Sequence, residues 1–268
     1  YIEFNQNGRV PNYPEFTHHA GERRSNQQVI FVDGYKGVRN NITSHADPFQ
    51  IYDVRTDLKE GHDLFKNPPT GQSAYFNQLQ QRMKDRVLQV RQIERDDPFD
   101  PSTDKVETRP YDKELVPPVI IKSAAGMEVS AYEGNWPWLP QFAELTAVKT
   151  TLIKTFDVTK HLSRPTHAGL CYRGFIKVPT DGTWTFFATS DAGMNLRIHD
   201  SLVIDDDFNH NSTEATGSIR LAAGLHPFTL SYRTIEQTPA LALQWSGPQT
   251  AKQPLPTAVL FHQQTAKR

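Results

Sequence analysis

The chain has 268 residues, which at roughly 150 residues per domain predicts about two domains. Its 29 Lys and Arg nearly balance its 30 Asp and Glu, so it lacks the basic excess of nucleic-acid-binding proteins, and we expect no nucleic-acid partner. No run approaches the ~18 apolar residues of a membrane span. The single cysteine, Cys171, excludes an internal disulfide and a Cys-based zinc site. Because the chain opens at Tyr1, within a predicted strand, we expect a fragment of a longer protein.

Residues 1–95 are predicted to form a small α+β subdomain. Strands are expected at 1–4, 28–32, 35–39 and 49–52, with a long polar loop over 5–26. Asp33-Gly34 gives the two-residue turn that suits a hairpin. A helix is predicted over 73–94, since its apolar residues recur every three or four positions and share one face. We therefore expect an antiparallel sheet covered by one C-terminal helix.

The next segment, 96–118, is polar, acidic and rich in proline, with Pro98, Pro101, Pro110, Pro117 and Pro118. Proline stiffens the chain and removes backbone donors. This composition predicts an interdomain linker.

From residue 119 to 268 the apolar pattern has a period of two. Trp184, Phe186 and Ala188 alternate with more polar positions, and Phe228, Leu230 and Tyr232 do the same. Turn signals such as Asp181-Gly182 and Ala223-Gly224 separate these runs. Short strands at this spacing predict a β-sandwich or barrel, and the chain as a whole is expected to be mainly β.

Several motifs of the second region resemble, in order, the protective-antigen-fourteen domain, a β-sandwich often attached to glycan-active enzymes and adhesins. The resemblance covers about 125–262. Its segments are YEGNW at 132–136, YRGFIKVPTDGTWTF at 172–186, SDAG at 190–193, LVID at 202–205, AGLHPF at 223–228 and LALQWSGP at 241–248. It implies a sandwich that binds carbohydrate.

The first region resembles the C-terminal subdomain of arylsulfatase-type sulfatases. FVDGYKGVR at 31–39 is similar to the strand-turn-strand of those enzymes, and IYDVRTDLKE at 51–60 is similar to a following acidic segment. The resemblance implies that a sulfatase catalytic domain precedes Tyr1, that the parent protein is a sulfuric ester hydrolase, and that it works in the periplasm or outside the cell.

The nucleophile motif of that family, Cys/Ser-x-Pro-x-Arg, has no match here. Cys171 is followed by Tyr172 and Arg173, so we interpret it as a small buried strand residue. Ser163-Arg164-Pro165-Thr166-His167 has His where the motif needs Arg, and a loop is predicted there. We expect no catalytic residue in this chain.

Calcium is the one cofactor that the resemblance to the protective-antigen-fourteen domain implies. In lectin members of that family, paired Asp residues at the acidic turn hold calcium, a cation that prefers hard oxygen ligands. Here Asp191 is present, but Ala192 takes the place of the second Asp. Two interpretations stay open: Asp191 is a metal ligand, or it is an acceptor within a structural turn.

Two further features are candidates for carbohydrate binding. Asp205, Asp206 and Asp207 are adjacent carboxylates that are either solvated or share a cation or polar ligand, and alternation places the first and third on one side if their strand continues. Trp136 can offer an aromatic face to a sugar or pack in the interior. By contrast, His18, His19, His199, His210 and His226 lack metal-ligand spacing.

The leading hypothesis is thus a non-catalytic C-terminal part of a sulfatase, whose β-sandwich binds carbohydrate or positions a sulfated glycan substrate. The alternatives are a separate carbohydrate-binding or adhesion module and a module that only packs against the catalytic domain.

Overall fold

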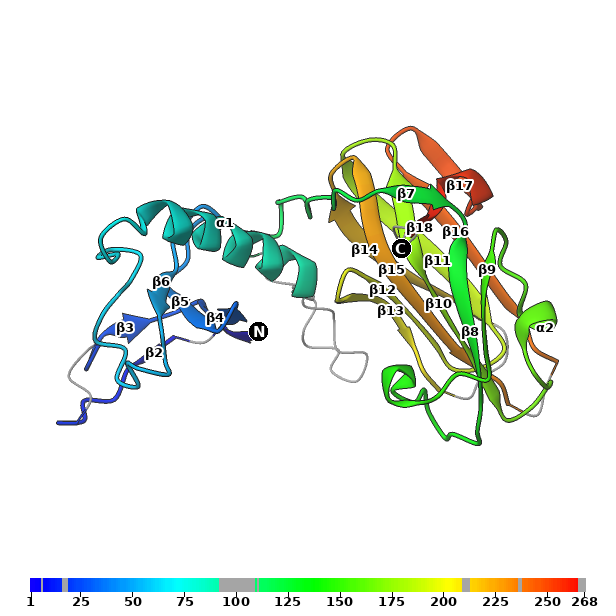
Figure 1. Cartoon of the computed structure of the whole chain (residues 1–268), viewed down its shortest axis with the longest axis horizontal. Coiled ribbons are helices and arrows are strands. Elements are labelled where there is room, and N and C mark those ends of the chain that lie inside the picture. Colours follow the sequence, from blue (N-terminus) through cyan, green and yellow to red (C-terminus); the bar gives the residue numbers. More distant parts are fainter. Residues whose placement is uncertain are drawn as a thin grey trace. The chain divides into compact units, whose positions relative to one another are not determined.

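The computed structural model describes residues 1–5, 7–15, 19–91, 109, 111–208, 213–235 and 238–264. The chain divides into two compact units, Tyr1–Glu114 and Leu115–Arg268 (Figure 1). Most elements are strands, which confirms the predicted mainly-β class.

The first unit contains a four-stranded antiparallel sheet in the order β1-β4-β5-β6. Its strands are β1 (Ile2–Phe4), β4 (Gln27–Val32), β5 (Tyr35–Asn40) and β6 (Gln50–Tyr52). The predicted hairpin is confirmed: Val32 pairs with Tyr35, and both turn residues, Asp33 and Gly34, have positive φ. The segment predicted as a loop includes a two-stranded ribbon of β2 (Gly8–Arg9) and β3 (Arg23–Arg24).

Helix α1 (Ser73–Val90) supplies the other half of this unit's core. Its buried residues Phe76, Leu79, Met83 and Val87 are on the predicted face and pack with sheet residues that include Ile30 and Ile51. The contact is close at one point, since a Cβ on Gly37 would lie 2.6 Å from the Met83 sulfur.

The described end of the predicted linker returns to the first unit. Tyr111 is buried, and the Arg91 side chain, just after α1, pairs with Glu3 of β1 and with Asp112. The Tyr111 hydroxyl also donates to Glu3. The segment that follows belongs to the second unit, where Val116 bridges to Leu221. Residues 92–108 and 110, which hold most of the predicted linker, lie outside the described part of the chain.

The second unit is built from an eight-stranded and a four-stranded antiparallel sheet. The larger has the order β13-β12-β15-β10-β18-β7, with β8 pairing with β10 and β9 pairing with β8. Its strands are β7 (Ser123–Ala125), β8 (Met127–Glu133), β9 (Lys149–Ile153), β10 (Ala168–Val178), β12 (Met194–Ile198), β13 (Ser201–Asp206), β15 (Gly224–Arg233) and β18 (Leu260–Gln263). The smaller has the order β14-β11-β16-β17, with β11 (Gly182–Ser190), β14 (Thr213–Leu221), β16 (Leu241–Gly247) and β17 (Thr250–Pro254).

The core of this sandwich lies between the two sheets. Trp184 and Phe186 of β11 and Leu230 and Tyr232 of β15 are fully buried, as their alternation predicts. On the outer face of the larger sheet, Cys171 is covered by Tyr132 and by Phe142 of a short 3-10 helix, η1 (Phe142–Glu144). A one-turn helix, α2 (Val158–His161), and a second 3-10 turn, η2 (Thr257–Val259), complete the unit.

Across the described residues, no helix is long and apolar enough to cross a membrane.

Candidate functional site

The acidic turn after β11 is tied into the core of the second unit. Asp191 is only 3% exposed, and its Oδ1 accepts hydrogen bonds from the Tyr232 hydroxyl at 2.6 Å and from the Ala240 N–H at 2.7 Å. Its Oδ2 is buried and has no hydrogen-bond partner among the described residues. Burial, and then the hydrogen bond to this carboxylate, raises the pKa of Tyr232 well above its usual range.

The three adjacent carboxylates are separated by the end of their strand. Asp205 is exposed, Asp206 is buried, and β13 ends at Asp206. The alternation that would place Asp205 and Asp207 on one side therefore does not continue. Asp207 turns instead toward the loop after β8, where its two oxygens accept the Leu139 N–H at 3.0 and 2.8 Å.

Arg233, which the sequence did not single out, joins Asp207 to the acidic turn. Its side chain is 2% exposed, its Nε lies 3.4 Å from Asp207 Oδ1, and its backbone N–H donates to the Gly193 carbonyl at 3.0 Å. A Cβ on Gly193 would lie 2.4 Å from that carboxylate oxygen and 2.7 Å from Arg233 Nε. Only glycine leaves room for this pair. We call Leu139, Gly193, Asp207 and Arg233 the loop-end cluster.

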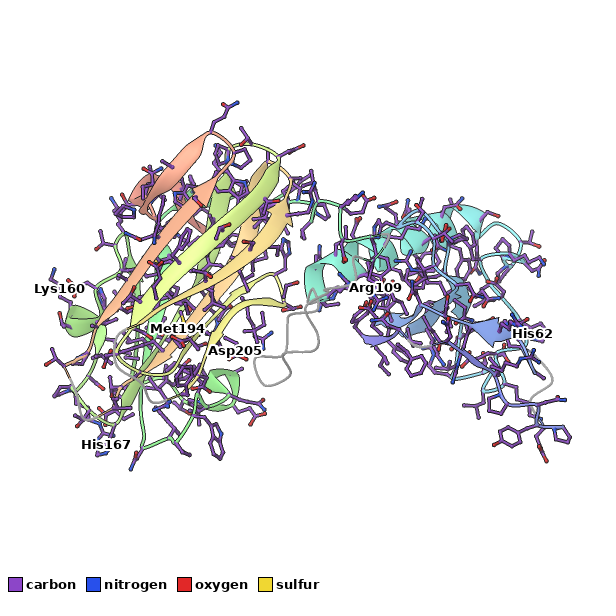
Figure 2. The ribbon with its side chains drawn as sticks, turned by 180° about the vertical axis from the view of Figure 1, so that it is seen from behind. His62, Arg109, Lys160, His167, Met194 and Asp205 are labelled. Carbon is purple, nitrogen blue, oxygen red and sulfur yellow. The ribbon has the colours of Figure 1, made fainter. Side chains whose placement is uncertain are left out.

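A pocket of about 260 Å³ lies beside Arg233. The indole of Trp136 lines it; this ring lies against Gly134 and meets Phe142 edge to face, with centroids 5.9 Å apart. His167, at the loop end of the sandwich in Figure 2, also lines it. The full lining is Asn135, Trp136, Pro137, His167, Arg233, Thr234 and Ile235. Of the predicted residues, Trp136 therefore lines a pocket. Asp207 does not line it but pairs with Arg233, which does. Asp191 is hydrogen-bonded within the core.

Residues 126–257 match the family model of the PA14 domain. The chain contains a PA14 domain. No curated protein matches the sequence.

Solved structures resemble about half of the chain. An anti-sigma factor domain-containing protein from Clostridium clariflavum is 22% identical, with 54% of this chain and 49% of that chain covered and a TM-score of 0.46. The PA14 domain of the antifreeze protein MpAFP is 15% identical over 54% of this chain and 94% of its own, with a TM-score of 0.44. The Epithelial Adhesin 9 A domain from Candida glabrata, in complex with Galβ1-3GlcNAc, is 10% identical over 53% and 90%, with a TM-score of 0.41. The chain thus spans about half the length of the first of these proteins.

Among the described residues, the acidic turn offers few free oxygen atoms to a calcium ion. Ca²⁺ takes six to eight oxygen ligands. Asp191 offers one oxygen without a partner, Ala192 offers no side-chain oxygen, and Asp207 is held by Leu139 and Arg233. Within the described part of the chain, no three His, Cys, Asp or Glu side chains gather as metal ligands.

Cys171, His199 and His226 are held within the PA14 domain. Cys171 is buried in β10, and burial raises the pKa of its thiol. Residues 163–167 form a loop without regular structure. His199 and His226 contact each other, with Nε2 and Nδ1 2.9 Å apart, while His226 Nε2 lies 2.8 Å from the Ala222 carbonyl. His18 and His210 lie outside the described residues.

Acidic residues of the first unit are also used locally. Asp47 accepts the backbone N–H groups of Thr43 and Ser44 at 2.7 and 3.0 Å. Asp57 accepts the N–H of Gly61 at 3.0 Å, and of the next residue at 2.8 Å. Asp53 pairs with Arg55, and Glu60 pairs with Lys36. These carboxylates shape turns and strand edges.

Proposed function

We propose that the second unit is a carbohydrate-binding module that takes a sugar in the pocket beside Arg233. The observation that carries this proposal is the Trp136 ring lining a pocket with polar groups around it, at the loop end of a PA14 domain. Aromatic rings with a few fixed polar groups are the usual composition of small-molecule sites.

The aromatic and polar lining residues have separate roles in this proposal. The indole of Trp136 supports the apolar face of a pyranose ring. Asn135, His167 and Thr234 offer hydrogen-bonding groups to its hydroxyls. The loop-end cluster fixes the frame, since Asp207 holds the loop that carries Trp136 through the Leu139 N–H.

We further propose that binding at this end does not require calcium. Arg233 supplies a fixed positive charge to Asp207. Tyr232 and Ala240 donate hydrogen bonds to Asp191, and these take the place of a metal ion at that carboxylate. The calcium hypothesis from sequence makes the opposite prediction, so a chelator separates the two.

The finer proposal is that the chain is the C-terminal part of a periplasmic or extracellular sulfatase. The segments that resemble sulfatases follow one another in the order found in those enzymes. They form the β4-β5 hairpin, then β6 with the acidic loop after it, and then α1. This sheet-and-helix unit supports the proposal. The test is the gene sequence upstream of Tyr1: a Cys/Ser-x-Pro-x-Arg motif within a few hundred residues is expected, and its absence would overturn the parentage.

A glycan array with the full chain tests the binding function. We expect neutral glycans to be retained, and Trp136→Ala to lose them because the sugar platform is gone. Trp138→Ala is the matched control, since Trp138 is 66% exposed on the same loop but does not line the pocket. If Trp136→Ala and Trp138→Ala bind glycans equally well, the sugar site is not in this pocket. Binding to no glycan would favour a module that only packs against another domain.

A further inference from the structure

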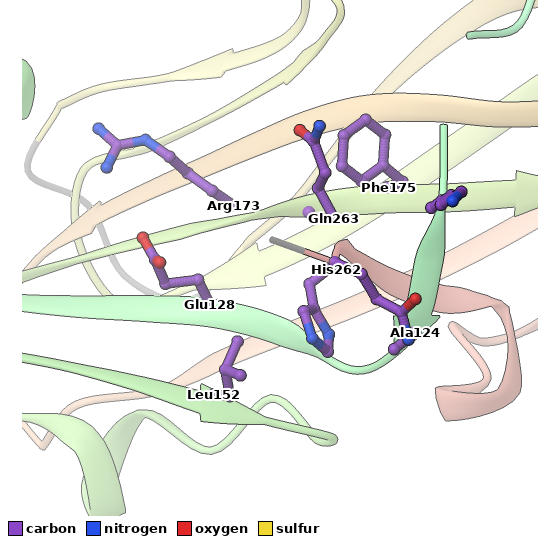
Figure 3. Close-up of a pocket in the computed structure, with 10 residues that line it drawn as sticks. Ala124, Glu128, Leu152, Arg173, Phe175, His262 and Gln263 are labelled. Carbon is purple, nitrogen blue, oxygen red and sulfur yellow. The ribbon is translucent and has the colours of Figure 1, made fainter. Parts of the chain in front are cut away.

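A second hollow of the PA14 domain lies away from the loop end, on the outer face of the larger sheet. Strand β10 pairs with β8 through Arg173 and with β18 from Phe175 onward. The two neighbouring strands diverge at this change of partner and leave a groove of about 870 Å³ (Figure 3).

The floor of the groove is backbone at Gly174. A Cβ there would lie 2.7 Å from the Phe261 carbonyl oxygen and 3.1 Å from the Met127 side chain. The Phe228 ring, in the core, is also 3.1 Å from that point, so there is no room for a side chain on the inner face of the sheet at Gly174. The apolar wall comes from Phe175 of β10 and from Leu152 of β9, whose side chain is 58% exposed.

Charged side chains line the groove without neutralising one another. Arg173 and Glu128 are directly opposite across β10 and β8, and Figure 3 shows both extending to the same side. Neither makes an ion pair with a described residue, and the same holds for Lys122 at the rim. His262 adds a buried Nδ1 that lacks a hydrogen-bond partner in the described part of the chain. Buried polar atoms in native proteins normally have such a partner.

We propose that this groove binds an acidic saccharide, one that carries a carboxylate or sulfate group. The Arg173 guanidinium takes the anionic group in a two-pronged hydrogen bond, with Lys122 adding positive charge. Phe175 packs against the sugar ring, and Glu128 accepts hydrogen bonds from its hydroxyls. The two cations outnumber the one carboxylate, which favours an anionic over a neutral ligand.

This inference rests on the proposed function in one respect, that the ligand is a sugar. The two sites share no lining residue. A Trp136 variant that loses neutral glycans leaves the groove intact, so failure at one site is distinguishable from failure at the other.

The test uses three trisaccharides that differ only in charge: maltotriose, maltotriose with one sulfate, and maltotriose oxidised to a single terminal uronate. Each is titrated into the full chain, with amide NMR shifts as the readout. We expect shifts at Gly174, Phe175 and Gln263 with the two charged sugars. Arg173→Gln weakens their binding by about tenfold or more, because the two-pronged hydrogen bond to the anionic group is lost.

Lys177→Gln is the matched control. Lys177 is an exposed cation on the same face of β10 but outside the groove, and its loss removes the same charge from the domain. The proposal expects this variant to bind as the native chain does. Equal loss in both variants, equal affinity for plain maltotriose, or shifts confined to other residues would each overturn it. A preference between sulfate and uronate identifies the anionic group.

Discussion

Two tyrosines of the PA14 domain provide a matched test of how Asp191 is held. Tyr172 and Tyr232 are both fully buried. The Tyr232 hydroxyl donates to Asp191 at 2.6 Å, whereas the Tyr172 hydroxyl is buried without a hydrogen-bond partner among the described residues. Replacing either with Phe removes one oxygen and nothing else.

The structure assigns opposite effects to the two changes. Tyr232→Phe removes one of the two hydrogen bonds to a buried carboxylate, which costs about 1.5–3 kcal/mol of unfolding free energy. Tyr172→Phe removes a hydroxyl whose desolvation is uncompensated, so it is neutral or stabilises by up to about 1 kcal/mol. Adding Asp191→Asn to Tyr232→Phe recovers part of the loss, because the charge left without its partner is gone.

Urea unfolding of the full chain measures this difference. All four tryptophans, Trp136, Trp138, Trp184 and Trp245, belong to the second unit, so their fluorescence reports the unfolding of that unit. The midpoint should fall for Tyr232→Phe and stay or rise for Tyr172→Phe at an unchanged slope. Equal losses in both variants would refute the assigned hydrogen bonding.

Three further changes test other parts of the fold. Gly37→Ala forces a Cβ against the Met83 sulfur and should destabilise the first unit by about 1–3 kcal/mol, measured by the helical circular dichroism signal during urea unfolding. Arg91→Met leaves two largely buried carboxylates unpaired, and the same assay should show a loss of about 3–5 kcal/mol. Burial lowers the pKa of His226 in the folded state. As the pH drops below about 6.5, the unfolded state therefore binds a proton that the folded state does not bind, and the stability of the second unit should fall. His226→Gln should flatten that dependence, and a pH profile identical to that of the native chain would contradict this assignment.

Local signals in the sequence were sufficient for much of the fold. The Asp33-Gly34 hairpin, the apolar face of α1 and the alternating core residues of β11 and β15 follow from turn chemistry and period alone. The helix ends at Val90 rather than 94, and residues 92–94 lie outside the described chain. Strands β7, β9 and β18 carry weak alternation because they are only three to five residues long and bury almost none of their side chains.

The candidate site depended on contacts that a local pattern does not contain. Asp207 is positioned by Leu139, 68 residues earlier, and by Arg233, 26 residues later. A lone Arg at the end of an alternating strand gives no signal of that pairing. The groove beside Arg173 was equally hidden, because it arises where β10 changes neighbours and not from a motif.

The most direct test of glycan binding is calorimetric titration of the tightest neutral glycan from the array into the full chain, once with calcium and once with a chelator. The account predicts the same affinity in both, with Trp136→Ala reducing it and Trp138→Ala leaving it unchanged. Binding that disappears with the chelator would contradict the assignment of Tyr232, Ala240 and Arg233 as the partners of the acidic residues.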